Sequence, residues 1–142
     1  MKANRIAHYF EQNPNSHPIQ ATLPVLFNYF SNLLIGYYAK DRSERGLMNA
    51  LNLRFPIQVK DYQSGIRNYS AMKVFQAIHE IRMADARSKG IDVTSSMTQG
   101  EIMKELLYKI MHWHLTEYQN IFLLFFSKLF LRNTSLNFLF LI

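Results

Sequence analysis

Apolar residues recur along this chain at the spacing of amphipathic helices, with short polar interruptions between the helical segments. The first segment, residues 3–10, is ended by Asn13-Pro14, because a residue before proline is disfavoured in the helical region. A second segment begins at Pro18 and keeps the helical period for about four turns, with Pro24 predicting either a start just before it or a kink. Its apolar positions are Leu23, Leu26, Phe27, Phe30, Leu33, Leu34 and Tyr37. We expect this helix to be the most buried one.

Two short helices are predicted next. Asp41 and Glu44 have the spacing of a capping box, and Pro56 suits the first position of a further helix that reaches Asn68. Two short helices around a turn are also the pattern of a helix-turn-helix, so a basic nucleic-acid-binding motif over residues 42–68 is kept as an alternative. The second helix, however, mixes polar with apolar residues where a DNA-reading helix would present polar side chains.

The clearest helix runs from Ser70, a good N-cap residue, to Gly90, which suits the left-handed conformation that ends helices. Its apolar stripe is formed by Ala71, Val74, Phe75, Ile78 and Ile81. Four residues further along this stripe lies Asp85, and burying a carboxylate without a partner would be costly. We therefore predict either that a cation pairs with Asp85 or that it lies at the solvated edge of the stripe. The candidate cations are Arg67, Arg82 and Lys89.

A last helix is predicted from a second capping box, Thr98 with Glu101. Its apolar face comprises Ile102, Met103, Leu106, Leu107, Ile110 and Met111. With only 5 Gly and 4 Pro in 142 residues, a fold with many tight turns is disfavoured. The sequence thus predicts an all-α fold, a compact bundle of five to six helices over residues 1–114.

The composition changes at Leu115. Phe, Leu and Ile supply 16 of the last 28 residues, yet charged and polar residues interrupt them too often for a membrane span. We interpret residues 115–142 as an atypical extension, such as a reading frame that continues past its usual end would produce. The further hypothesis that this is an orphan, membrane-associated chain is supported by this extension alone.

The net charge and the chemically reactive residues limit the functions that we expect of this chain. The net charge of +6 permits contact with DNA or acidic surfaces, but no base-reading motif accompanies it. The absence of Cys fits a reducing compartment, and no signal peptide is recognised, so we expect a cytoplasmic protein. The sequence has no phosphate-binding glycine loop, and His112 and His114 point about 200° apart on a helix. No cofactor, metal or catalytic residue is therefore predicted, and we expect no enzyme activity from this chain by itself.

Several stretches carry a family resemblance. They are KDY at 60–62, RNYSAMKV at 67–74, ADARSKG at 84–90, LLYKIMH at 106–112, KANRI at 2–6 and LFNYFSNLL at 26–34. In these stretches the chain resembles the C-terminal region of the delta subunit of the bacterial DNA polymerase III clamp loader. The resemblance covers about residues 1–112, and Pro24 and everything after His112 depart from it.

The resemblance implies a helical collar domain, which in that family assembles with the collars of delta prime and the ATPase subunits into a ring. It implies no catalytic residue, because the ATPase motors belong to the partner chains, and it implies no membrane partner. Any DNA contact by this chain is not expected to be sequence-specific. The candidate interface or structural residues are Arg67, Asn68, Tyr69, Arg82, Asp85, Arg87 and Lys89.

Overall fold

The computed structural model describes residues 2–91 and 97–112, and every regular element within these ranges is an α-helix. The helices are α1 (Lys2–Gln12), α2 (Ile19–Tyr38), α3 (Glu44–Ala50), α4 (Pro56–Asn68), α5 (Ala71–Ser88) and α6 (Gln99–His112). The all-α prediction is thereby confirmed for the described residues. The predicted boundary at residue 114 and the extension 115–142 lie outside them.

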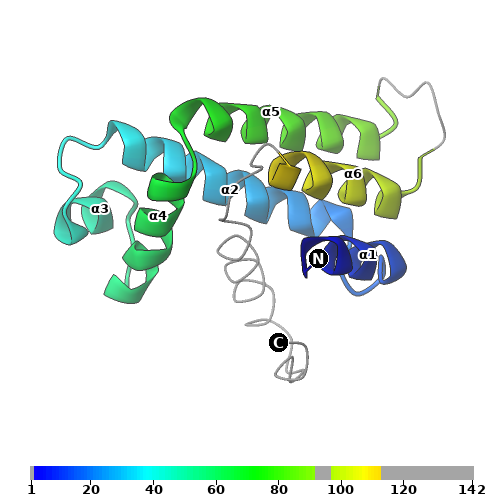
Figure 1. The fold of residues 1–142 in the computed structure, drawn as a ribbon, viewed down its shortest axis with the longest axis horizontal. Helices are drawn as coiled ribbons and strands as arrows, with labels where there is room; N and C mark the ends of the chain where they lie inside the picture. The colour runs from blue at the N-terminus through cyan, green and yellow to red at the C-terminus, as the bar shows by residue number, and fades with distance from the viewer. Residues whose placement is uncertain (1, 92–96, 113–142) are drawn as a thin grey trace.

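The two longest helices, α2 and α5, lie side by side and antiparallel and make the most extensive helix pair (Figure 1). α6 packs against α5 and α1, whereas α3 and α4 lie near the C-terminal end of α2. One hydrophobic cluster joins α1, α2, α5 and α6. Its largest fully buried side chains include Phe30, Leu26, Leu33, Ile81, Leu107 and Ile110.

α2 is buried along more of its circumference than the sequence pattern predicts. Tyr29 is buried, because α4 covers that side of the helix, and Phe27 is partly exposed instead of belonging to the core. α2 starts at Ile19 with Pro18 as its N-cap, so Pro24 lies inside the helix, on an exposed position. An exposed site suits proline, because water can solvate the carbonyl group that loses its helical hydrogen bond.

The start of α3 differs from the prediction. Ser43, not Asp41, is the N-cap, and its side chain accepts a hydrogen bond from the Gly46 backbone N–H. Asp41 supports this cap from outside the helix, because it accepts hydrogen bonds from the Ser43 N–H (2.8 Å) and hydroxyl (2.9 Å). These bonds lower the pKa of Asp41.

The predicted ends of α5 and the start of α6 are confirmed. Ser70 caps α5, and Gly90 has φ +76° in a Schellman motif in which the Ile91 N–H donates to the Ala86 carbonyl at 3.0 Å. The reciprocal bonds of the Thr98–Glu101 capping box are both present. Local capping signals thus fixed these helix boundaries.

The apolar stripe of α5 is rotated from its predicted position. The buried residues are Val74, Ala77, Ile81 and Ala84. The stripe continues through Ala84 and not through Asp85, and Phe75 is exposed. The rotation follows from packing, because α5 must face α2 and α6 at once, and small alanines allow the close approach.

Gly65 allows α4 to lie close to α2, where a Cβ atom would stand 2.5 Å from Leu33 Cδ2 and 2.6 Å from Tyr29 Oη. Overpacking costs about 1–3 kcal/mol, whereas alanine gains only about 1 kcal/mol in helix propensity over glycine. We expect Gly65→Ala to lower the free energy of unfolding by about 1 kcal/mol, measured by urea denaturation. The exposed Lys60→Ala on the same helix should stay within about 0.5 kcal/mol of the wild type. A stabilised Gly65→Ala protein would contradict this packing.

Candidate functional site

An ion network joins α5 to α6 and includes one of the predicted interface residues. Arg87 contacts Glu105 at 3.0 Å, and Lys109 contacts both Glu105 (2.8 Å) and Glu80 (2.9 Å). Hydrogen bonds from Lys109 and then Arg87 lower the pKa of Glu105, and the two carboxylates raise the pKa of Lys109. Arg87 thus has a structural role within the chain.

The structure separates the other predicted residues. Lys89 Nζ lies 2.6 Å from Asp85 Oδ2, and the Asp85 side chain is 44% exposed, so this carboxylate lies paired at the edge of the stripe. Asn68 is half-buried and donates to Ser64 Oγ at 3.5 Å. Tyr69 belongs to the core, edge-on to Phe30, and burial raises its pKa.

Two of the predicted cations stay on the surface. Arg67, in the last turn of α4, and Arg82, on α5, are exposed, and neither forms an ion pair within the described part of the chain. The predicted residues therefore do not converge on one site. Of the predicted guanidinium groups, those of Arg67 and Arg82 form no ion pair with the described residues and so keep donors for an interface.

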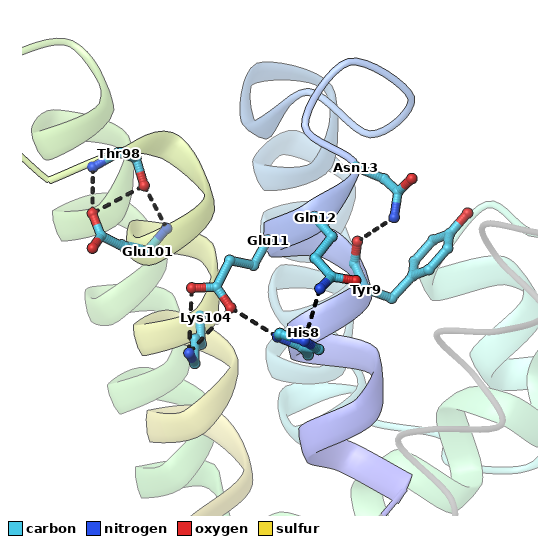
Figure 2. A network of polar contacts seen from close by, with 8 residues as sticks. All are labelled: His8, Tyr9, Glu11, Gln12, Asn13, Thr98, Glu101 and Lys104. Atoms are coloured by element: carbon cyan, nitrogen blue, oxygen red, sulfur yellow. Dashed lines mark hydrogen bonds and ion pairs between the residues drawn. The ribbon is translucent and has the colours of Figure 1, made fainter.

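A second polar network connects α1 to α6 (Figure 2). Glu11 Oε2 lies 3.1 Å from both His8 Nδ1 and Lys104 Nζ, and the hydrogen bonds from His8 and Lys104 lower the Glu11 pKa. Gly100 allows the helices to approach closely, since its Cβ would stand 3.0 Å from the Glu11 backbone. The network holds α1 on α6.

An open pocket of about 370 Å³ lies beside this network. It is lined by Glu11, Glu101, Lys104, Glu105 and Tyr108. The pKa of each of these three carboxyl groups is lowered, for Glu101 mainly by the hydrogen bond from the Thr98 N–H. A general acid that works near neutral pH needs a raised pKa, so these carboxylates suit ion pairing and not proton donation.

The feature that sequence reasoning missed is an exposed apolar face on α2 and α5. α2 carries no charged residue in 20 positions, although Phe27, Ile35 (47% exposed) and Tyr38 all reach solvent. Their spacing places them on one face of the helix. On the neighbouring α5, Met72 and Phe75 are also exposed. We group these five exposed side chains, three on α2 and two on the adjacent α5, under the name α2/α5 face.

The lack of charge over the whole of α2 was the signal that could have revealed this face. A helix that is exposed to water on one side normally carries charged residues there, and a helix without them is normally covered on all sides. Exposed apolar residues that share one face of a helix, as Phe27, Ile35 and Tyr38 do, indicate a candidate contact surface for another protein.

The helix-turn-helix alternative loses support at the start of α4. Gln58, a candidate base-reading residue there, uses its side-chain oxygen to accept a hydrogen bond from the Phe55 N–H at 3.2 Å. Phe55 and Ile57 beside it are exposed and offer no donor or acceptor to a base edge, although Arg54 and Lys60 are exposed at the same end.

Among the described residues, no group of three or more His, Cys, Asp or Glu side chains is placed to hold a metal ion. Nor does any helix in those ranges combine the length and apolarity needed to cross a bilayer. Comparison with protein-family models, curated proteins and solved structures gave no match.

We expect Glu105→Gln to lower the free energy of unfolding at pH 7 by about 1 kcal/mol, because Arg87 and Lys109 share this carboxylate. The folded pKa of Glu105 lies below its ordinary value of 4.5, so its stabilisation is complete above that pH and is lost as the pH falls through the folded pKa. Urea titrations from pH 7 downward should show wild type and variant converge as the pH falls through the folded pKa of Glu105, which lies below 4.5. A pH-independent difference would contradict an ionic origin.

We expect Asp85→Asn to change the free energy of unfolding by less than about 0.5 kcal/mol, because an exposed pair one helical turn apart contributes little. The same urea assay at pH 7 measures it. A loss of more than about 2 kcal/mol would instead indicate a buried, uncompensated charge on Lys89.

Proposed function

We propose that this chain is the helical collar domain of a clamp-loader delta subunit, which assembles with delta prime and the ATPase subunits. The α2/α5 face carries this proposal. The resemblance of six stretches to the delta subunit supports it and supplies the partners.

The physical case rests on what such a face requires of its environment. Moving apolar surface out of water contributes about 25 cal/mol per Å², so five exposed apolar side chains on adjacent helices favour association. A charged partner residue buried against uncharged α2 would find no counter-ion there, so the contact area of the partner must be largely uncharged. A helix from another helical domain meets this requirement.

The exposed cations suit the rim of such a contact. Arg82 lies on α5 at a helical spacing that continues from Met72 and Phe75, and Arg67 lies in the last turn of α4. Rim charges orient partners more than they stabilise them. In this proposal the domain performs no chemistry and works in the cytoplasm with the replication machinery, and any contact that it makes with DNA is independent of sequence.

Copurification with delta prime and the ATPase subunit from the same source tests the proposal. We expect a complex with the wild-type chain, and we expect Ile35→Lys to weaken it by at least about tenfold, because the new ammonium group would be buried without a partner. Size-exclusion chromatography and calorimetry measure this change.

Tyr108→Lys is the matched control. Tyr108 is 55% exposed, close to the exposure of Ile35, but it lies on α6. Its replacement should leave affinity within about twofold of the wild type, and thermal melts should show both variants folded. Absence of any complex would overturn the proposed function, and equal loss in both variants would overturn the choice of the α2/α5 face.

A further inference from the structure

A second exposed apolar site lies where α4 begins, remote in sequence from the α2/α5 face. Phe55 is 58% and Ile57 66% exposed, and Arg54 and Lys60 beside them are also exposed. We call these four residues the α4 tip. In Figure 1, α4 begins at the lower left, away from α5, and rises toward the start of α5. Neither apolar side chain is part of the core cluster.

Local hydrogen bonds hold the backbone of this tip. α3 ends in a Schellman motif, with Asn52 at φ 50° and the Leu53 N–H donating to the Met48 carbonyl at 2.9 Å. The Gln58 N–H then donates to the Phe55 carbonyl at 3.0 Å, while the Phe55 N–H donates to the Gln58 side chain at 3.2 Å. The apolar side chains are therefore presented by a preorganised backbone, which reduces the entropy lost on binding.

The surroundings of the tip are basic. Residues 40–68 contain six basic and three acidic residues, a net charge of +3. Arg54 and Lys60 form no ion pair among the described residues. The one carboxylate of α4, Asp61, is half-buried, and its charge adds to the burial that raises the pKa of Tyr62. Charge complementarity thus selects an acidic partner.

The backbone argues for a protein and against a phosphate group as the ligand. A helix N-terminus binds phosphate through several free N–H groups, but Pro56 has none and those of Phe55 and Gln58 are already bonded, which leaves the Ile57 N–H alone in this first turn. Recognition must come from the side chains, and two of the four are apolar. Phosphate contact would leave Phe55 and Ile57 in water, whereas an apolar protein groove would bury them.

We propose that the α4 tip is a docking site for an acidic, amphipathic protein segment, whose apolar face covers Phe55 and Ile57 while its carboxylates pair with Arg54 and Lys60. This site does not rest on the collar assignment. It also differs in chemistry from the uncharged α2/α5 face, so the two surfaces select different partners.

The test uses a fluorescently labelled helical peptide with leucines at i, i+3, i+4 and i+7 and glutamates elsewhere. A peptide of the same composition with scrambled leucines is the control. We expect the full chain to bind the amphipathic peptide at least about tenfold more tightly than the scrambled one, by fluorescence anisotropy. Two double variants should each remove this preference: Phe55→Ser with Ile57→Ser, and Arg54→Glu with Lys60→Glu. Added salt should weaken binding to the wild type.

Ile35→Ser, on the α2/α5 face, is the matched variant that should bind the peptide as the wild type does. Equal binding of both peptides, or tip variants that bind like the wild type, would overturn the proposal. Duplex DNA and anionic phosphatidylglycerol vesicles are tested as competitors. If either displaces the peptide, and its binding is lost in the same tip variants, then it and not a protein segment is the ligand of the tip. Sedimentation showing a dimer that the tip substitutions dissociate would assign the tip to a second copy.

Discussion

The burial of α2 is the constraint on which the fold depends. This uncharged helix packs against α3, α4, α5 and α6, and hydrogen bonds anchor α4 to it, from Asn32 to the Tyr62 hydroxyl and from the Tyr37 hydroxyl to the Ile66 carbonyl. Because α2 offers no charges, the neighbouring helices meet it mainly with apolar or neutral polar groups, and among the described residues the cation Arg42 donates to the Tyr37 carbonyl and lies over the Tyr37 ring. The absence of charged residues also leaves the side of α2 that none of the described helices covers apolar. The same feature of α2 therefore underlies both the packing of the domain and its proposed association.

Charge has the opposite role in the molecule. Arg87 and Lys109 connect α5 to α6, Lys104 connects α6 to α1, and Lys89 pairs within α5. Much of the basic charge on these helices is thus paired with carboxylates inside the chain. The overall net charge of +6 therefore says less about nucleic acid than the location of the unpaired cations does. Several of those lie around α3 and α4.

The domain has two exposed apolar surfaces that differ in chemistry. The α2/α5 face is apolar and nearly uncharged, whereas the α4 tip combines two apolar side chains with two cations. The two surfaces suit a chain that meets different neighbours on different sides, as a member of a mixed assembly does.

The sequence by itself determined the order of the helices, both ends of α5 and the start of α6, because capping residues such as Ser70 and Thr98, and breakers such as Gly90, act within a few residues of the bond they make. It also bounded the fold class. Only the tertiary structure decided which side of each helix is buried. The sequence pattern places Phe75 in the apolar stripe of α5, but Phe75 is exposed, because α5 contacts α2 and α6 together and buries a different side. The surfaces depend on which side is buried, since exposure is set by long-range packing and not by local propensity.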